Sequence, residues 1–443
     1  MNYIKPLALT TIAAALAACG GDDSNDDQAY LRVLHASADA PNVDVALNGD
    51  VVLRDVSFQQ GTGYLEIEDG LTTVEILVAG TETVAFSTEV DLMDNGYYSV
   101  IAINDVAELD LKVIDDTATY TDGDADVTVV HAATVADDVD IFVTAPGDDP
   151  DTSADTPALD GVPFEANATL EAVAAGDYEV FIGGDESEEL VYASGELNVA
   201  GDIALVAVNS IKGRSPVSLI AWSDSGATTV LDNSAELRVV HAVDDIDVDV
   251  FANGELFIDG FTYQSVNGYT VLDPGTVSVA IAADDQGLGN ALANLSGDLT
   301  LERGESYTVI ASGDSGAVTD AQLIVLTDTR AAEDASNGYV RLVHASSATA
   351  ADPVDIFVYE NGMTQPQSPT FADVEQGQDT GYVALSPATY TVDIAADDTT
   401  SPAISGLDSL PFAAGDVKTA IAIGDSSGLD ALLLNDKRGS GVE

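Results

Sequence analysis

The chain has 443 residues, a single cysteine and a net charge of −64, because 77 acidic residues oppose 13 basic ones. A polyanion of this density repels nucleic acid and anionic headgroups, which excludes nucleic-acid binding, and one cysteine excludes an intrachain disulfide. At ~100–200 residues per domain the length predicts three or four domains. The charge favours a protein adapted to a saline habitat, where salt screens self-repulsion; divalent-cation binding is the alternative.

The first segment predicts an exported lipoprotein. Lys5 precedes an apolar stretch of about ten residues, which is too short to span a bilayer but suits the core of a signal peptide. The stretch ends in Leu16-Ala17-Ala18-Cys19, which resembles a bacterial lipobox, where the leader is cut before the cysteine and the thiol is acylated. We therefore expect a signal peptide over residues 1–18 and membrane anchoring through a lipidated Cys19. Simple secretion is the alternative.

Residues 19–29 are polar and have no apolar periodicity, so they predict a disordered tether. In lipoproteins of Gram-negative bacteria, an aspartate directly after the cysteine tends to retain the protein at the inner membrane. This chain has Gly20 at that position. The resemblance therefore implies an outer-membrane lipoprotein, either periplasmic or exposed at the cell surface. No later apolar run is long enough to predict a transmembrane helix.

Four stretches of the chain open with the same strand, which ends in His-Ala. All 4 histidines of the protein occupy this one position, namely His35, His131, His241 and His344. Their spacings are 96, 110 and 103 residues (35 to 131, 131 to 241, 241 to 344). A unit of about 100 residues copied along a chain is typical of an array of β-sandwich domains.

Period-two alternation predicts eight strands in the first repeat. They are expected over residues 30–36, 43–48, 51–54, 63–68, 72–79, 83–91, 97–104 and 108–114. The other repeats keep this order, with a Val-Asp-Val/Ile second strand and a late strand that is apolar on both faces. Gly-Tyr opens a middle strand at Gly63-Tyr64, Gly268-Tyr269 and Gly381-Tyr382, whereas the second repeat has Ala168-Thr169-Leu170.

The predicted fold is all-β, with four tandem Ig-like antiparallel β-sandwich domains joined by short acidic linkers. The domains are expected over residues 30–118, 126–224, 236–331 and 339–437, with a tail over 438–443. The linkers are expected over residues 116–126, 223–235 and 327–338. Linkers of this length limit bending without abolishing it, so four domains end to end would reach on the order of 150 Å.

The four repeats resemble the bacterial family called domain of unknown function 4397. The resemblance rests on the Arg-Val-x-His-Ala opening and the Val-Asp-Val/Ile strand, and is fullest in Arg32–Ala36 with Val43–Gly49. It implies an extracytoplasmic, Ig-like protein, and it brings no catalytic residues to carry over.

Alternation places each histidine on the apolar inward face of the opening strand. We expect half-buried imidazoles with backbone or hydroxyl partners, because no repeat holds the further histidines that a metal site would use. The arginines of this strand face the other way, as does the aspartate of the second strand. If the two strands pair, cross-strand Arg–Asp contacts follow between Arg32 and Asp44, Arg238 and Asp249, and Arg341 and Asp355. The second repeat has Thr128 and Asp140 at these positions; ligand binding by the arginines is the alternative.

Two acidic clusters are candidate calcium sites, because alternating carboxylates can gather oxygen ligands around a hard cation. They are Asp122, Asp124 and Asp126 in the first linker, and Asp244, Asp245 and Asp247 in the third repeat. Chance clusters are expected in so acidic a chain, so solvated acidic loops are the alternative. We expect no other cofactor.

Gly313-Asp314-Ser315-Gly316 resembles the nucleophile segment of serine proteases, but no histidine lies in a plausible triad context. We therefore expect a non-enzymatic, lipid-anchored envelope protein that presents its repeats to a surface glycan or protein. The competing hypothesis is a structural spacer or envelope-layer protein without a specific ligand, in one version stiffened by calcium. A hydrolase of surface polymers is a remote third.

Overall fold

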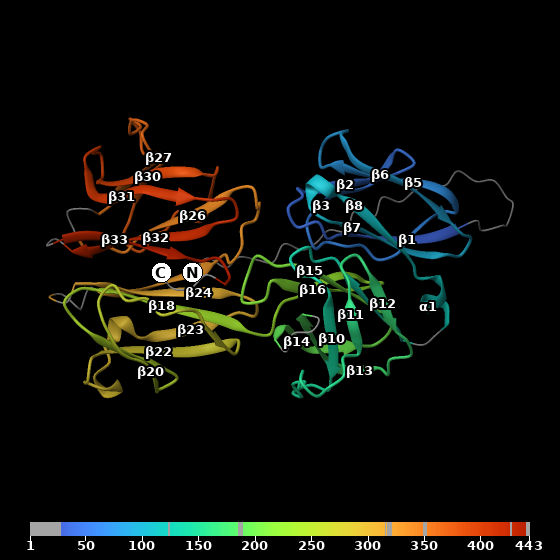
Figure 1. The fold of residues 1–443 in the computed structure, drawn as a ribbon, viewed down its shortest axis with the longest axis horizontal. Helices are drawn as coiled ribbons and strands as arrows, with labels where there is room; N and C mark the ends of the chain where they lie inside the picture. Colours follow the sequence, from blue (N-terminus) through green and yellow to red (C-terminus); the bar gives the residue numbers. More distant parts are fainter. Residues whose placement is uncertain are drawn as a thin grey trace. The chain divides into compact units, whose positions relative to one another are not determined.

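The computed structural model describes residues 28–122, 125–184, 189–314, 316, 321–348, 352–425 and 428–439. The expected signal peptide, Cys19 and most of the tether lie outside the described residues, as does Asp124. The chain divides into two compact units, shown with its strands in Figure 1. The first comprises Met1–Gly123 with Trp222–Thr228, and the second comprises Asp124–Ala221 with Thr229–Glu443.

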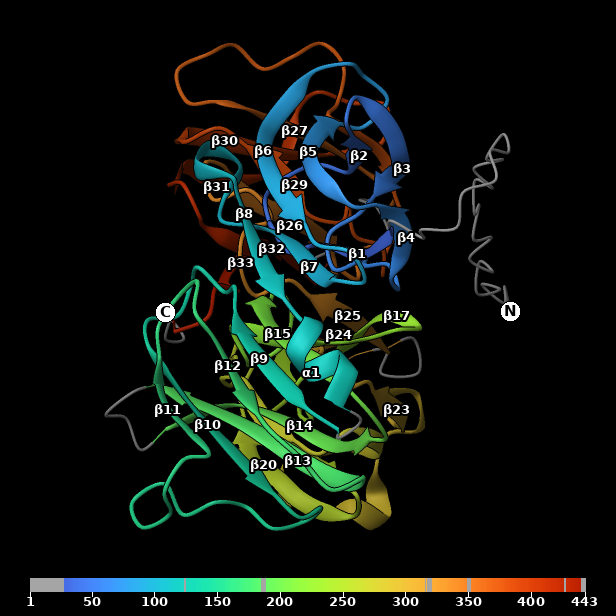
Figure 2. The same ribbon diagram turned by 90° about the vertical axis from the view of Figure 1, so that its right-hand side faces the viewer.

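Repeat 1, which forms most of the first unit, is a sandwich of two four-stranded sheets with the orders β4-β1-β7-β8 and β3-β2-β5-β6 (Figure 2). Its strands are β1 (Gln28–His35), β2 (Val43–Leu47), β3 (Asp50–Val56), β4 (Leu65–Glu68), β5 (Gly70–Val78), β6 (Val84–Leu92), β7 (Tyr97–Ile103) and β8 (Asp110–Asp115). A 3₁₀ turn, η1 (Val106–Glu108), precedes β8, and the short helix α1 (Thr117–Asp122) follows it. All eight predicted strands are present, so this prediction is confirmed.

Repeat 2 builds one sheet of order β12-β9-β15-β16-β17 and another of order β11-β10-β13-β14. Its strands are β9 (Val127–His131), β10 (Val139–Thr144), β11 (Leu159–Val162), β12 (Asn167–Leu170), β13 (Gly176–Gly184), β14 (Leu190–Val199), β15 (Ile203–Asn209), β16 (Val217–Ser223) and β17 (Gly226–Val230). The predicted second linker therefore contains a strand, β17, and its first residues belong to the segment Trp222–Thr228 of the first unit.

Repeats 3 and 4 each have two four-stranded sheets in the arrangement of repeat 1. Repeat 3 consists of β18 (Ala235–Val243), β19 (Val248–Ala252), β20 (Glu255–Phe261), β21 (Thr270–Leu272), β22 (Gly275–Ala283), η2 (Leu288–Asn290), η3 (Ala293–Leu295), β23 (Gly297–Leu301), β24 (Ser306–Gly313) and β25 (Gln322–Asp328). Repeat 4 consists of β26 (Gly338–His344), β27 (Val354–Glu360), β28 (Phe371–Val374), β29 (Val383–Leu385), β30 (Ala388–Ala396), β31 (Pro402–Phe412), β32 (Val417–Asp425) and β33 (Gly428–Asn435).

Each repeat has a hydrophobic cluster between its two sheets. In repeat 1 the inward row of β1, Leu31 and Val33, packs with Val45 of β2 and Ile76 of β5. The all-β sandwich class is thereby confirmed. One pairing departs from the antiparallel expectation, because the opening strand lies parallel to the late apolar strand in every repeat, as in β1 with β7 and β18 with β24.

Repeats 3 and 4 pack against each other through the outer faces of the sheets that contain their opening strands (Figure 1). We call these two outer faces the paired face. Its apolar part consists of Val240, Ala242, Ile310, Ile324 and Leu326 from repeat 3 and Val343, Ala345, Ile421, Ile423 and Leu434 from repeat 4. The expectation of an end-to-end array with bending linkers is therefore wrong for these two repeats. In repeats 3 and 4 the late strands are apolar on both faces because one face packs in the core and the other packs on the neighbouring repeat.

Candidate functional site

The arginine of the opening strand lies in a polar cluster on the outer face of its own sheet. In repeat 3, Nε of Arg238 donates a hydrogen bond to Oγ1 of Thr308 on the adjacent strand β24, at 3.0 Å. The hydroxyls of Thr308 and Tyr269 donate to Asp328, at 2.5 and 2.7 Å. The Arg238 guanidinium lies over the Tyr269 ring, 4.5 Å from its centroid. Two hydroxyls and two cationic neighbours, Arg238 and Arg341, thus satisfy a carboxylate that is 1% exposed.

Repeat 4 contains the same four groups in the same arrangement. Arg341 donates to Thr419 at 3.2 Å, and Thr419 and Tyr382 donate to Asp436 at 2.6 and 2.8 Å. The Arg341 guanidinium lies 4.6 Å from the centroid of the Tyr382 ring. Asp436 is completely buried.

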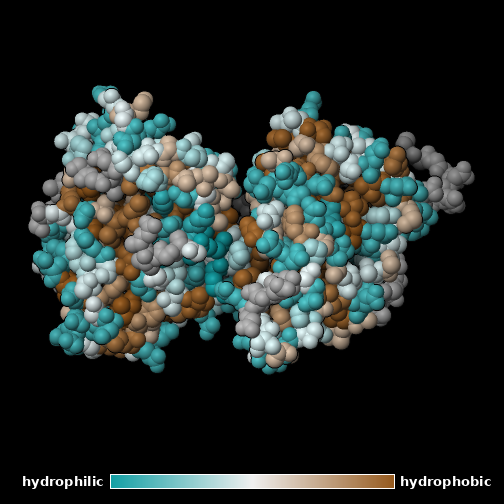
Figure 3. Space-filling view, in the orientation of Figure 1, coloured by the Kyte–Doolittle hydropathy of each residue, from teal (hydrophilic) through white to brown (hydrophobic). Residues whose placement is uncertain are grey.

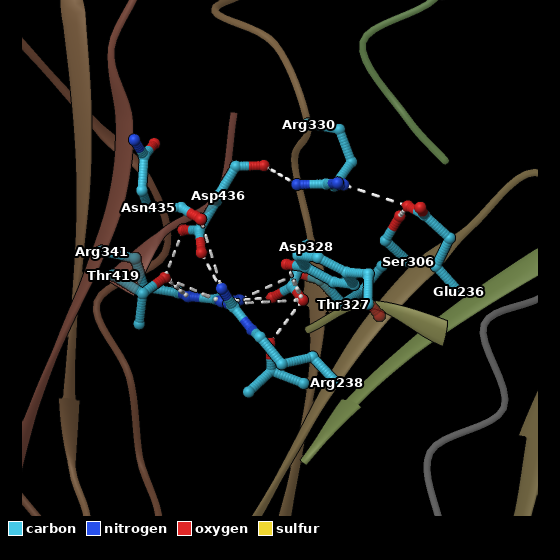
Figure 4. Close-up of polar contacts among 12 residues, drawn as sticks. Glu236, Arg238, Ser306, Thr327, Asp328, Arg330, Arg341, Thr419, Asn435 and Asp436 are labelled. Carbon is cyan, nitrogen blue, oxygen red and sulfur yellow. Dashed lines mark hydrogen bonds and ion pairs between the residues drawn. The ribbon is translucent and has the colours of Figure 1, made fainter. Parts of the chain in front are cut away.

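The two clusters exchange their charged partners across the paired face, as Figure 4 shows. Nη2 of Arg238 lies 2.6 Å from Oδ1 of Asp436, and Arg341 forms the reciprocal ion pair with Asp328. Arg238 also donates to the backbone carbonyl of Asn435 at 3.4 Å, and Arg341 to that of Thr327 at 2.9 Å. Each arginine is therefore neutralised by the aspartate of the other repeat.

The electrostatics of this network keep both cations charged and the tyrosines neutral. Burial alone would lower the pKa of Arg238, but Asp436 and its other neighbours raise it; in Arg341 the same balance, with Asp328 as the largest favourable partner, also raises the pKa. Burial raises the pKa of Tyr269 far above its usual range. Burial also raises the pKa of Asp436, against the opposing effect of Arg238. The network thus pairs two cations with two anions, and its tyrosines serve as hydrogen-bond donors.

Residues of the predicted third linker complete the network. Nε of Arg330 lies 3.0 Å from Oε2 of Glu236, and the Arg330 guanidinium also donates to the backbone carbonyl of Asp436. The same guanidinium lies 3.8 Å from the centroid of the Tyr269 ring, which it shares with Arg238. The segment after β25 is therefore part of the contact between repeats 3 and 4.

Repeat 1 contains the same kind of cluster, but its arginine contacts a different group outside the cluster. Arg32 donates to Ser99 at 2.7 Å, and Ser99 and Tyr64 donate to Asp116 at 2.5 and 2.9 Å. The outer partner is Trp222 of the same unit. Arg32 donates to its backbone carbonyl at 3.2 Å and lies 4.3 Å from the centroid of its indole ring. Here a neutral aromatic ring, rather than a second aspartate, covers the guanidinium.

Repeat 2 lacks the cluster. Thr128 occupies the arginine position on β9, and Thr169, its partner on β12, occupies the tyrosine position. Their hydroxyl oxygens lie 3.0 Å apart. One short hydrogen bond thus replaces the Arg–Tyr stack.

The expected cross-strand contact between the opening-strand arginine and the second-strand aspartate is wrong, because the two strands belong to different sheets. The aspartates instead accept hydrogen bonds from backbone amides at the irregular edge strand. The pairs are Asp44 with Asp55, Asp140 with Gly161, Asp249 with Gly260 and Asp355 with Asp373, at 2.8, 2.8, 3.1 and 3.2 Å. All four amide donors have φ between 54° and 56°, so each aspartate holds a left-handed residue at a β-bulge.

The four histidines are 0–1% exposed. Nε2 lies within hydrogen-bond distance of a backbone carbonyl in three of them: 3.3 Å from Pro41 for His35, 2.8 Å from Asp137 for His131 and 2.8 Å from Ile246 for His241. In His344 the same nitrogen lies 3.8 Å from a carboxylate oxygen of Asp352. The structure places the imidazoles in four separate cores and not in one pocket.

Burial lowers the pKa of His35 and His241 below the usual 6.5, so we expect acid to destabilise the fold. Below pH ~6.5 the unfolded chain binds protons at these groups before the folded chain does, so stability falls as the pH falls. Replacing His241 with Gln keeps a donor for Ile246 but removes one titrating group. The variant should lose stability less steeply between pH 7 and 5.5 in thermal melts, by at most about 1.4 kcal/mol per pH unit. Parallel pH profiles for the two proteins would contradict the linkage.

The candidate calcium residues are distributed differently from the prediction. Asp126 is buried and accepts a hydrogen bond from the amide of Ala172 at 2.7 Å. Asp244 lies close to Asp314 and Asp425, and one carboxylate oxygen of each lies within 4.8 Å of the others. Asp245 and Asp247 are not part of this triplet. Among the described residues, two further triplets occur at related places in repeats 3 and 4, namely Asp249, Asp259 and Asp284, and Asp355, Asp373 and Asp397. Nothing is described of Asp124 or of the Asp122 side chain.

Within the described part of the chain, no helix has the length and apolarity needed to cross a bilayer. No curated protein matches the sequence. The Bacillus anthracis TIE protein is a solved structure with 10% identity and a TM-score of 0.15, over 93% of this chain and 66% of that one. The product complex of the multi-modular glycogen-degrading pneumococcal virulence factor SpuA has 11% identity and a TM-score of 0.17, over 94% and 37%. The chain spans less than two thirds of the length of either protein.

The model of one family matches residues 29–142 and 235–357, which together exceed half of the chain. The first match covers repeat 1 and the opening of repeat 2, and the second covers repeat 3 and the opening of repeat 4. Both include an Arg-Val/Leu-x-His-Ala strand and the Val-Asp-Val/Ile strand that follows it. The chain belongs to the family described as "Domain of unknown function (DUF4397)".

Proposed function

We propose that this chain is a lipid-anchored, non-catalytic protein of the outer membrane that presents its β-sandwich repeats to a surface glycan or protein. The family and the all-β, multi-repeat fold are compatible with a non-catalytic envelope protein. The proposal rests on where the arginines lie and what they contact. Seven of the eight arginines contact residues of their own unit at partly or fully buried positions, and Arg54 has a side chain 70% exposed.

This use of the arginines leaves the surface strongly acidic. Because the paired face is buried, repeats 3 and 4 offer their other sheets and their loops to a partner, and loops commonly carry binding residues. Figure 3 shows hydrophilic residues over much of the visible face, with apolar residues in small groups between them. Such a surface favours recognition of a polar ligand over a broad apolar partner.

Lipidation makes the first prediction for this function. We expect metabolic labelling with a palmitate analogue to tag the wild-type protein, because the Leu-Ala-Ala-Cys order ends at Cys19. The Cys19→Ser variant should lose the label and appear in the soluble fraction. Label that persists in this variant would exclude Cys19 as the attachment site.

Exposure and binding test the remainder of the proposal. Protease treatment of intact cells should release fragments of the repeats if they face outward, and should spare a periplasmic control protein. A glycan array and a cross-linking pull-down with the mature protein should then identify a ligand. An excess of the soluble repeats should compete with the mature protein for that ligand. Repeats that resist protease until the outer membrane is permeabilised would contradict surface presentation.

The second candidate function is a structural spacer or envelope-layer protein without a specific ligand. The paired repeats 3 and 4 favour it, because buried ion pairs at a domain contact fix its geometry. Calorimetric titration with calcium in high salt tests the calcium-stiffened version. Heat of binding with a rise in melting temperature would support stiffening, whereas the absence of both up to millimolar calcium would remove it.

A further inference from the structure

The contact between repeats 3 and 4 has an internal two-fold character. Its two ion pairs have exchanged roles: Arg238 pairs with Asp436 at 2.6 Å and Arg341 pairs with Asp328. Contacts at its margin, such as the hydrogen bond from Ser312 to the backbone carbonyl of Ala345, are not duplicated among the described residues. The supporting carbonyls, of Asn435 and Thr327, immediately precede the two aspartates in the sequence. Each repeat therefore presents one buried cation and one buried anion to its neighbour.

The apolar part of the paired face repeats in the same way. Strand register makes Thr308 and Thr419 equivalent, since each lies beside the opening-strand arginine. The same register relates Val240 to Val343, Ala242 to Ala345, Ile310 to Ile421 and Leu326 to Leu434, and all eight belong to the one cluster. A surface that contacts its own equivalent by reciprocal contacts has the signature of an isologous interface, as found in two-fold dimers.

We propose that the paired face is a docking surface for a second copy of this chain, with repeat 3 of one molecule bound to repeat 4 of the other. In the closed form, repeats 3 and 4 of one chain bind each other; in the exchanged form, each binds its partner repeat from a second chain. The two forms have the same ion pairs and the same apolar contacts, and they differ only in which chain supplies each repeat. Nine residues, 329–337, connect β25 to β26, and a segment of this length extends to roughly 30 Å. Exchange of like elements between protomers is a low-cost route to dimers, and this inference depends neither on the lipid anchor nor on an external ligand.

The exchanged ion pairs allow a complementation experiment with two variants of the mature chain, both in a Cys19→Ser background. In the Arg238→Asp variant, two anions face each other within the chain; in the Asp436→Arg variant, two cations do. Like charges at a contact cost several kcal/mol, so both variants are expected to be open and monomeric. In a mixture, repeat 3 of the first variant meets repeat 4 of the second with opposite charges, and the other exchanged contact has the native residues.

Mixing the two variants should therefore give a heterodimer of twice the monomer mass in native mass spectrometry and light scattering. Its amount should exceed the dimer of either variant alone by more than about tenfold. The chain that carries both substitutions is the matched control, because it restores opposite charges in cis and should regain the wild-type melting temperature as a monomer. A mixture that stays monomeric while this control recovers would overturn the proposal.

A second measurement decides the case in which the single variants do not fold. Light and isotopically heavy wild-type chains are unfolded, mixed and refolded at high protein concentration and high salt. We expect a dimer peak of mixed mass that increases with concentration and that Arg341→Met abolishes. Monomer alone at every concentration would overturn exchange between copies.

Discussion

The Arg341→Met variant is expected to lose about 3–5 kcal/mol of the free energy of unfolding, because it leaves a buried carboxylate without its ion-pair partner. Asp328 is 1% exposed and would keep hydroxyl donors, from Tyr269 and Thr308, but among the described residues its one remaining ion-pair partner would be Arg238 at 3.8 Å. The substitution would also remove the guanidinium that lies over the Tyr382 ring and donates to the backbone carbonyl of Thr327. Chemical denaturation followed by circular dichroism measures the loss.

The matched control is the same substitution at an exposed arginine. Arg54→Met removes a contact to Asp44 at 3.4 Å, and the Arg54 side chain is 70% exposed. Exposed ion pairs contribute ~0–1 kcal/mol, so this variant should melt close to wild type. Equal melting temperatures for the two variants would mean that the buried network does not hold repeats 3 and 4 together.

The Trp222→Ala variant is expected to destabilise the first unit by about 3–5 kcal/mol, because it creates a large cavity at a fully buried position. The indole Nε1 donates to the backbone carbonyl of Thr62 at 2.6 Å, and the indole ring covers the guanidinium of Arg32. Gly61 packs so closely here that an added Cβ would lie 3.1 Å from the same nitrogen. Thermal unfolding measures the effect. It is followed by circular dichroism, because Trp222 is the only tryptophan of the chain and the variant has no indole fluorescence.

Two further variants separate the contributions of the indole. Trp222→Phe keeps an aromatic plane over Arg32 but leaves the Thr62 carbonyl without its donor, so an intermediate loss of about 1–3 kcal/mol is expected. Met363→Ala truncates a residue that is 66% exposed, and it should change stability by less than about 0.5 kcal/mol. A loss in Trp222→Ala no larger than that in Met363→Ala would show that the ring is not part of a core.

The strands could be predicted because alternation in this chain is strong and local. In repeat 1 each predicted strand end lies within two residues of the observed one. Alternation also assigned inward and outward faces, so Leu31 and Val33 line the core and Arg32 lies opposite them. It could not say which strands share a sheet, which is why Asp44 was matched with the wrong partner.

The network between repeats 3 and 4 was missed because its acidic members lie at the ends of last strands, next to segments that resemble linkers. Asp328 and its counterpart in repeat 1, Asp116, fall within the predicted linkers, yet both are buried. One signal in the sequence could have found it. Repeats 1, 3 and 4 share an arginine on the opening strand and a Gly-Tyr tyrosine, whereas repeat 2 has Thr128 and Thr169 at these places. Residues that are lost together indicate a common contact.

Local spacing was also a poor guide to the acidic clusters. Asp244 meets Asp314 and Asp425, which are 70 and 181 residues further along the chain, because all three follow or end strands at one edge of the paired repeats. Only the parallel pairing of the opening and late strands, together with the contact of repeats 3 and 4, brings such residues together.

The distance between repeats 3 and 4 in solution tests most directly whether the exchanged ion pairs hold them as one body. Spin labels at Thr276→Cys on β22 and Thr389→Cys on β30 occupy equivalent exposed positions on the outer sheets, in a Cys19→Ser background without other cysteines. Pulsed dipolar spectroscopy should give a single narrow distance distribution that broadens in the Arg341→Met variant. A distribution that is already broad in the otherwise wild-type chain would mean that the two repeats move as independent domains. It would contradict the claim that the ion pairs hold repeats 3 and 4 together.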